Sequence, residues 1–465
     1  MRADVTSTTS GSDLGNDQTC LPTTECRERD SVNPISKSPT YSTVVGQRIS
    51  SVLLQAHVEI FLEHLYPIMP VFDADAVMVD CANPEILPPR RYAFLAAMCA
   101  ATHLQLKLDL PHGATHGEIS PSGRSLIDQA IQALRDFDPV DEPHIDSLLT
   151  FFFLFSAYGN LDQHDHAWHY LSQSISFAFL LKLHQEQTYL PLDAEVAELK
   201  RRIYWLLFIT ERAYALQRSM PIVLRACIQK PSVFASKSPA IAYGFVNLIS
   251  VFEKLPLIFF DWDASAAESL IFSDTANSVY HCMAISTPLL AEYNETQRVD
   301  LVVTQQWLQA RLWKVYTKQD SSKCNQGTVI PVELLVNAGK SVMALMSTVS
   351  QKSADAHGIG IEQKLYDIGE AISLLAYALL PRTNDSAGEL FTCTQGLLCG
   401  ILHRLSSIRG SQSYLFDPLL QKSHEILGLD SLPASLAFQT QLIPDIPTED
   451  GLEAADSGDY DSLLL

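Results

Sequence analysis

Residues 198–221 read ELKRRIYWLLFITERAYALQRSMP, and this stretch decides the fold class of the chain. Apolar and aromatic residues recur on nearly every side of it at helical spacing, and the proline at position 221 stops the pattern. A helix that is apolar around most of its circumference is buried among other elements. The stretch therefore predicts a central helix of a large helical domain.

Charged residues are nevertheless set into this helix. One face carries, at steps of four, three and four residues, Arg201, Trp205, Phe208 and Arg212. Another face carries Leu199, Ile203, Leu206, Thr210 and Ala213. So much charge in a segment that is otherwise suited to burial requires partners for the charged groups.

The expected pairing follows from the spacing. Glu198 precedes Arg201 and Arg202 by three and four residues, so it can pair with either of them. Glu211 and Arg212 are adjacent and cannot face each other on a helix. The partner of Glu211 is therefore expected from another helix or from the arginine seven positions further on.

Two interpretations of the arginines remain open. In the first, they stack on Trp205 and bind carboxylates bidentately, which ties neighbouring helices together. In the second, Arg201, Arg212 and His184 line a pocket for an anionic or hydroxylated ligand. The first is favoured, because buried charges are more often paired than ligand-binding.

The rest of the chain supports an all-α fold of packed antiparallel helices. Helical periodicity recurs in IDSLLTFFFLFSAY (145–158), AWHYLSQSISFAFLLKLH (167–184) and further segments up to about residue 428, and no run of alternating strands occurs. We expect a disordered, linker-like segment at 1–46, a helical domain at 47–430 and an acidic tail at 431–465. Scattered leucines in that tail could dock into a groove of a partner.

Composition excludes several classes of protein. The 465 residues carry a formal charge of −21, which repels phosphate backbones, so we expect no unaided binding of nucleic acid. Nine cysteines without a C-x-x-C pair indicate a reduced, intracellular protein. The sequence shows no signal peptide and no apolar stretch long enough to span a membrane, so a soluble protein is expected.

Candidate metal and catalytic motifs are weak. In DQHDHAWH (162–169), His164, His166, His169 and Asp162 could approach a metal, but the alternative is a polar helix start capped by Asp162 or Asp165. DFDPVDE (136–142) resembles the aspartate-rich motifs of helical terpene synthases, but its proline predicts a turn. No phosphate-binding loop, nucleophile elbow or HExxH occurs, so we predict no catalytic residue, no metal and no cofactor.

Three motifs in order resemble the fungal-specific transcription factor domain, the middle homology region of activators with a Zn₂Cys₆ cluster. They are YPIMPVF (66–72), the segment from FFFLFSAYGN to AWHYLSQSISFAFLLKLH (151–184) and the opening stretch. Lys182 replaces the glycine of the family's L-G-L-H pattern, and Ser219 and Met220 replace the G-R before Pro221. Family-motif positions are Glu198, Arg201, Arg202, Trp205, Glu211, Arg212 and Pro221. The sugar-responsive subgroup is the most similar.

The resemblance implies a nuclear regulator of RNA polymerase II genes, for example metabolic or secondary-metabolite genes, and no enzyme. It implies the transcription machinery or a repressor protein as partner, with an effector ligand not identified by the sequence. The family's cysteine cluster does not occur here, so DNA is reached through a missing N-terminal module or a partner. The alternatives are a DNA-binding-deficient partner that heterodimerises with, or titrates, a full-length zinc-cluster factor, and a helical enzyme. A homodimer of the chain is also compatible with the resemblance.

Overall fold

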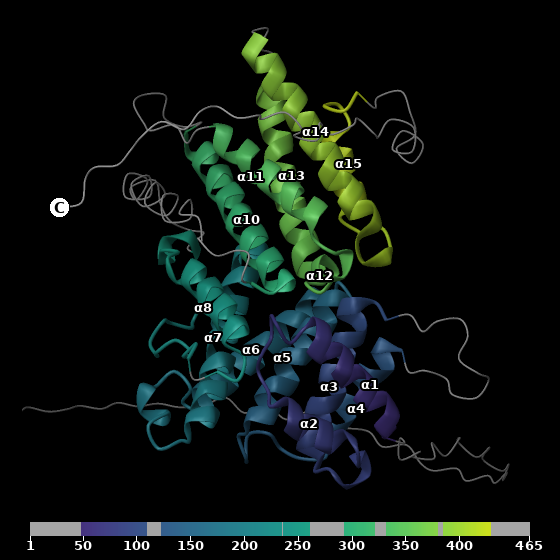
Figure 1. Ribbon diagram of the computed structural model, residues 1–465, viewed down its shortest axis with the longest axis vertical. Coiled ribbons are helices and arrows are strands. Elements are labelled where there is room, and N and C mark those ends of the chain that lie inside the picture. Colours follow the sequence, from purple (N-terminus) through teal and green to yellow (C-terminus); the bar gives the residue numbers. More distant parts are fainter. Residues whose placement is uncertain are drawn as a thin grey trace, which may run out of the picture. The chain divides into compact units, whose positions relative to one another are not determined.

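The structure, a computed structural model, describes residues 48–108, 122–234, 236–260, 293–320, 332–379 and 385–428. These residues belong to one compact unit that begins at Arg48. Within them every regular element is a helix (Figure 1), which confirms the all-α prediction. The tails predicted at 1–46 and 431–465 lie outside the described residues.

The first half of this unit holds eight of the fourteen described α-helices. They are α1 (Ser51–His64), α2 (Ala74–Cys81), α3 (Pro89–Leu106), α4 (Gly123–Leu134), α5 (Ile145–Asn160), α6 (His164–Leu180), α7 (Ala194–Arg218) and α8 (Pro239–Glu253). Short 3-10 helices occur at η1 (Pro84–Ile86), η2 (Glu186–Thr188) and η3 (Leu257–Phe260). Helix α5 packs against both α3 and α6, and α4 covers α3.

The second half holds the six remaining described α-helices. They are α10 (Glu295–Asp320), α11 (Val332–Thr348), α12 (Gln351–Asp355), α13 (Ile359–Leu379), α14 (Asp385–Ser407) and α15 (Phe416–Ser423), with η6 (Ile408–Gly410) after α14. Helix α13 packs against α10, α11, α14 and α15, and is therefore the central helix of this half (Figure 1).

Sequence signals explain several helix starts. Ser50, Asp73 and Ser122 precede α1, α2 and α4, and each side chain accepts a hydrogen bond from a backbone N–H three residues later. This N-cap satisfies one of the donors that a helix start leaves unpaired. In the segment PVFDADAVMVD (70–80), Asp73 thus marks the start of helix α2.

Two helices end at other residues than their periodic patterns do. Helix α5 continues past the periodic segment 145–158 to Asn160, so residues 161–163 separate it from α6. Helix α7 ends at Arg218 rather than at Pro221, because Ser219 adopts a left-handed conformation with φ 57°. A residue in that conformation ends the helical hydrogen-bond pattern before the proline is reached.

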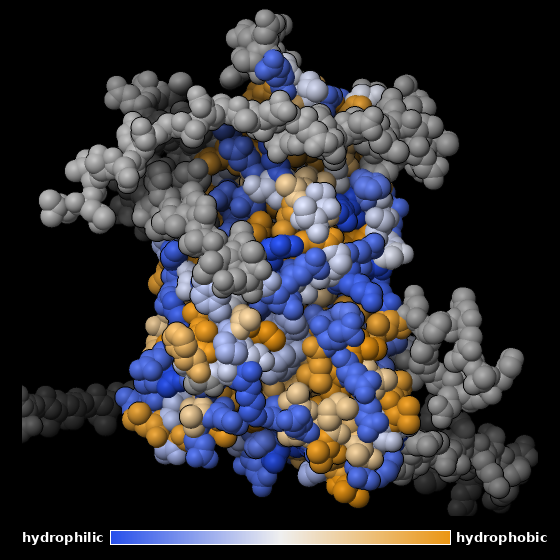
Figure 2. All heavy atoms as spheres, viewed as in Figure 1, coloured by the Kyte–Doolittle hydropathy of each residue, from blue (hydrophilic) through white to orange (hydrophobic). Residues whose placement is uncertain are grey.

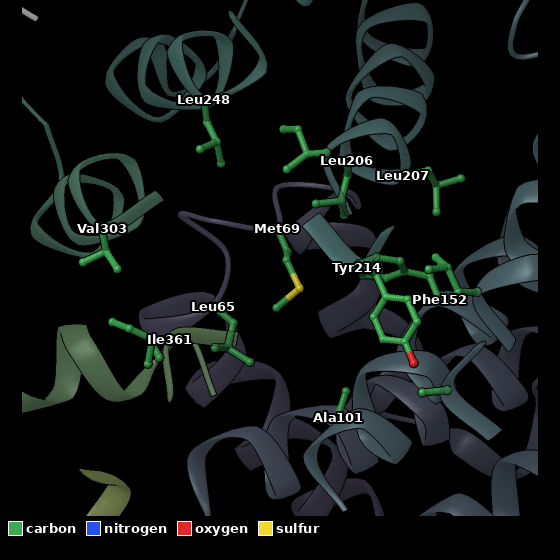
Figure 3. Packing of buried hydrophobic residues seen from close by; sticks show 14 of the residues in the cluster. Leu65, Met69, Ala101, Phe152, Leu206, Leu207, Tyr214, Leu248, Val303 and Ile361 are labelled. Carbon is green, nitrogen blue, oxygen red and sulfur yellow. The ribbon is translucent and has the colours of Figure 1, made fainter. Parts of the chain in front are cut away.

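A continuous apolar core runs through the described helices of both halves. Figure 3 shows part of it, where Phe152 of α5, Tyr214 of α7, Leu248 of α8 and Met69 from the segment between α1 and α2 converge. On the face shown in Figure 2, polar and apolar residues are intermixed. Among the described helices, none is long and apolar enough to cross a membrane.

Candidate functional site

Arg201 of α7 forms a bidentate ion pair with Glu186. Its two terminal nitrogens donate to the two carboxylate oxygens at 3.0 and 2.5 Å, and Glu198 Oε1 lies 3.8 Å from the Arg201 Nε atom. The guanidinium carbon lies 4.3 Å from the centroid of the Tyr189 ring. The hydrogen bond from Arg201 holds the pKa of Glu186 below its usual value, so the pair is charged at neutral pH.

Two further motif residues bind the backbone that follows α7. The indole Nε1 of Trp205 donates to the carbonyl of Gln229 at 2.9 Å. The carboxylate of Glu211 accepts the backbone N–H groups of Val223 and Leu224 at 2.7 and 3.0 Å. Despite these bonds, burial raises the pKa of Glu211, which is only 1% exposed.

Arg212 completes this set of contacts. It donates to the carbonyl of Leu224 at 3.1 Å, and its guanidinium carbon lies 3.4 Å from the centroid of the Phe208 ring. Its Nη1 atom is 3.8 Å from the carboxylate of Glu211, although the spacing excluded direct pairing of these two residues. Burial lowers the pKa of Arg212 to about 10.

These contacts correct the interpretation of the helix charges. The arginines stack on Tyr189 and Phe208 rather than on Trp205. The hydrogen-bond partners of Glu211 are backbone groups, and its nearest charged neighbour is Arg212 rather than Arg218 or another helix. The contacts of the motif residues gather on the segment 222–232. We call this segment the post-α7 strap. Backbone donors carry no sequence signature, so residue types could not predict them.

The other motif positions lie around this arrangement. Glu198 Oε2 accepts the backbone N–H of Ser232 at 2.7 Å, and Arg202 and Glu198 line a cavity of about 310 Å³. Pro221 lies between the end of α7 and the strap. The His184 ring contacts the Phe179 ring in a tilted arrangement, with 4.9 Å between ring centroids.

Two positions where the family pattern has glycine adopt a left-handed backbone. Lys182 has φ 56° and Ser219 has φ 57°. Glycine reaches this conformation without the steric cost that a Cβ atom imposes. The backbone therefore explains the glycines of the L-G-L-H and G-R-P patterns, although this chain has other residues at both places.

The opposite face of α7 lines a cavity of about 220 Å³. Leu206, Thr210 and Ala213, which the periodicity placed on a second face, all line it. The remaining walls come from the α1–α2 segment and from helices α3, α5, α6, α8, α10 and α13, and apolar atoms make up most of the cavity surface. Three of the apolar wall residues, Met69, Phe152 and Leu248, are labelled in Figure 3. Arg201, Arg212 and His184, the predicted ligand-sensing residues, line neither this cavity nor the 310 Å³ one.

Arg218, the last residue of α7, lines the polar part of this cavity. Its Nη2 atom lies 3.5 Å from the side-chain oxygen of Gln363 on α13. Burial raises the pKa of Tyr414 to about 12, and its hydroxyl bonds both Arg218 and Asp162. Within the described residues Arg218 has no carboxylate within ion-pair distance.

The other ionisable groups of the cavity wall are satisfied. Lys364 donates to Asp300 at 3.1 Å and to Thr304 at 2.7 Å, so its charge is compensated. Burial lowers the pKa of His357 and that of His164, so both are neutral at pH 7. Of the charged groups in this wall, Arg218 is the one without an opposite charge in contact among the described side chains.

Beside the cavity, Arg409 of η6 connects the two halves of the unit. It donates to the side-chain oxygen of Asn160 at 2.9 Å and to that of Glu362 at 2.6 Å. The backbone N–H of Ile359 also donates to Asn160 Oδ1, and Gln105 of α3 donates to the carbonyl of Ala356. Polar bonds therefore join α3 and α5 to the start of α13.

The histidines of the candidate metal motif have separate surroundings. His164 bonds Asp162 at 2.7 Å, His166 stacks on Tyr158 and His169 bonds Gln173. Over the described residues no group of three or more potential ligands converges. The expected cap is also corrected, because Gln163 rather than Asp162 or Asp165 occupies the N-cap position of α6.

Comparisons with known proteins bear on this arrangement. Residues 58–230 match the fungal specific transcription factor domain. The chain is 23% identical over 359 residues to the maltose fermentation regulatory protein MAL13 of Saccharomyces cerevisiae, which covers 75% of this chain and 72% of that protein. It is 22% identical to the probable sucrose utilization protein SUC1 of Candida albicans, over 74% of this chain and 69% of that protein.

A third relative, the respiratory transcription factor ZNF1 of Saccharomyces cerevisiae, is 21% identical over 74% of this chain and 73% of its own length. The family is one of transcription factors and not of enzymes, which confirms the resemblance carried by the three motifs. Residues 58–230 are a fungal specific transcription factor domain, and the chain is a distant homologue of the maltose fermentation regulators.

Proposed function

We propose that this chain is the effector-responsive part of a nuclear fungal transcription regulator that controls RNA polymerase II target genes. The observation that carries the proposal is the 220 Å³ cavity. Its walls come both from the family domain at 58–230 and from the helices beyond it, including α10 and α13. A ligand in this cavity contacts both the family domain and the helices that follow it.

The cavity provides a physical route from ligand to output. A ligand shifts a conformational equilibrium only by its difference in affinity for the two states. If the position of α13 relative to α7 differs between a silent and an active state, a ligand that bridges Arg218 and Gln363 binds one state better. Occupancy then changes the population of the active state.

The proposed output is recruitment of the transcription machinery by the acidic tail at 431–465, or release from a repressor protein. The tail combines acidic residues with leucines in the sequence, a composition that suits docking of a short amphipathic helix. The names of the relatives support target genes of carbon-source use. Contact with DNA is proposed to come through a zinc-cluster module outside these 465 residues.

A reporter experiment tests this function. The full chain is fused to an unrelated DNA-binding module, and reporter expression is measured during growth on several carbon sources, with and without residues 431–465. We expect expression that depends on both the tail and the growth condition. Expression that never exceeds that of the module alone would contradict the proposal.

A filled cavity provides a sharper test. A Cβ atom at Gly159, which lines the cavity, meets no atom within 4 Å, so Gly159→Leu can extend into this space. The matched control is Gly396→Leu on the exposed side of α14, where a Cβ also meets nothing. Gly159→Leu should fix reporter expression at one level, while Gly396→Leu should keep the response.

The second candidate, a regulator that acts by pairing with a zinc-cluster factor, predicts a different result. It is motivated by the sequence itself, in which no C-x-x-C pair occurs. Co-purification of the tagged chain with a zinc-cluster protein of the host, together with no activation by the fused chain alone, would favour this candidate over the first.

A further inference from the structure

We propose that the 220 Å³ cavity binds a small amphipathic carboxylate, whose carboxylate lies at Arg218 and whose apolar body lies against Phe152, Phe155 and Leu206. This inference rests on the proposed function only for its biological role. The site itself is argued from the lining of the cavity.

The charge of the cavity selects an anion. Arg218 lines it with one long contact to Gln363 and a hydrogen bond to the Tyr414 hydroxyl, which also bonds Asp162, and no carboxylate of the described residues lies within ion-pair distance of Arg218. Lys364 and Asp300 neutralise each other at 3.1 Å. The wall therefore has an excess positive charge at Arg218, where a carboxylate could accept two parallel hydrogen bonds.

Two further polar groups lie on the same side of α7. Thr210 and Gln217 line the cavity, and their side chains make no hydrogen bond within the described part of the chain. Thr210, Tyr214 and Arg218 are spaced four residues apart and so share one face of the helix. A carboxylate at Arg218 can extend its hydrogen bonds to groups of this face.

Other polar residues of the wall are already occupied. Gln105 accepts from Ser156 at 2.9 Å and donates to a backbone carbonyl, and Asn160 accepts from Arg409 and donates to a carbonyl of its own helix. A sugar carries hydroxyl groups on every side, and those that faced the apolar walls would be buried without partners. Such unpaired groups are costly, which disfavours a sugar as the ligand.

The volume sets the size of the ligand. A protein cavity of about 150 Å³ accommodates benzene, whereas drug-sized ligands occupy cavities of about 300 Å³ or more. A cavity of about 220 Å³ lies between these limits. It fits an aromatic or short aliphatic acid of about ten non-hydrogen atoms, by the same scale.

Titration calorimetry on the full chain tests the proposal with benzoate and hexanoate as acids, benzamide as the neutral match of benzoate, and glucose and maltose as sugars. We expect at least one acid to bind, and benzamide to bind at least about tenfold more weakly than benzoate. Arg218→Gln should weaken binding of the acid by about 10- to 100-fold. Arg124→Gln, at an exposed arginine of α4, should leave it unchanged.

Two further variants separate binding from folding. Thr210→Val keeps the shape of the side chain and should weaken binding of the acid only a few-fold, whereas Gly159→Leu should abolish it at an unchanged far-ultraviolet circular dichroism spectrum. Gly396→Leu should bind as the wild type does.

Several results would overturn the carboxylate assignment: no binding of either acid, equal binding of benzoate and benzamide, tighter binding of a sugar, or full binding by Arg218→Gln. Each of these results leaves the proposed regulatory role to be decided by the reporter experiment. A reporter without activity, combined with binding of an acid, would contradict the role and keep the site.

Discussion

The guanidinium of Arg409 donates to the side-chain oxygen of Asn160 at 2.9 Å, across 249 residues of sequence. The same guanidinium pairs with the buried carboxylate of Glu362 and reaches the carbonyls of Leu104 and Gln105. One side chain of the second half thus binds α3, α5 and α13 beside the cavity. The two halves are therefore fastened by a residue that does not itself line the cavity.

Arg409→Met should destabilise the chain strongly. The substitution leaves Glu362, which is 1% exposed, with a buried charge and the Ser413 hydroxyl as its remaining side-chain partner among the described residues. Breaking a buried ion pair in this way costs about 3–5 kcal/mol. Urea denaturation of the full chain measures the change. If Glu362→Gln, added to Arg409→Met, restores none of the loss, the cost does not arise from the unpaired carboxylate.

Glycine at the two left-handed positions should stabilise the chain. Lys182→Gly and Ser219→Gly each remove the strain of a Cβ atom at positive φ, offset in part by the greater freedom of glycine in the unfolded chain. We expect a gain of about 0.5–1 kcal/mol for each. The control Ser176→Gly, in the interior of α6, should lose about 0.5 kcal/mol. Thermal melting compares the three, and a loss at Lys182 and Ser219 would contradict the strain argument.

Glu211→Gln should loosen the post-α7 strap. The glutamine amide offers one oxygen for the two N–H groups of Val223 and Leu224, so a buried donor is left unpaired and Arg212 loses its nearest carboxylate. The expected loss is about 2–4 kcal/mol. Glu195→Gln, at an exposed position of α7, serves as the control and should change stability by less than about 0.5 kcal/mol. Hydrogen exchange of the strap amides should rise in Glu211→Gln alone.

The ion pair between Arg201 and Glu186 should make stability depend on pH. Arg201 depresses the pKa of Glu186 below its ordinary value of 4.5, so the pair stabilises the folded chain above that pH. The contribution is lost as the pH falls through the lower pKa of the folded state. The stability advantage of wild type over Glu186→Gln should therefore be full at pH 7 and shrink below about pH 4.5.

The control for this pH dependence is Glu59→Gln, because Glu59 is exposed on α1 and makes no hydrogen bond within the described residues. Its difference from wild type should stay constant over the same pH range. If the difference in stability between wild type and Glu186→Gln is also constant, the bidentate pair is not the cause of the pH dependence.

Periodicity was enough to predict the helices, because burial imposes a 3.6-residue repeat that the sequence displays directly. It predicted α7, whose residues between Arg201 and Leu216 are mostly buried, and separated its two faces. Periodicity did not show what each face contacts, because the partners of Trp205 and Glu211 are backbone groups of a segment that has no periodic pattern. The cavity was missed for a related reason, since its walls come from many elements and Arg218 has no distinctive spacing from Gln363.

The contact between Arg409 and Asn160 also sets an order of events during synthesis. The partners of α7 in the strap lie 12 to 34 positions later in the chain, so the strap can form soon after it leaves the ribosome. Arg409, the partner of Asn160, is synthesised 249 residues later. At about 5–20 residues per second, this delay is roughly 12–50 s, during which the apolar face of the first half is uncovered. Until residue 409 has emerged, this apolar surface of the first half is therefore open to association with other chains.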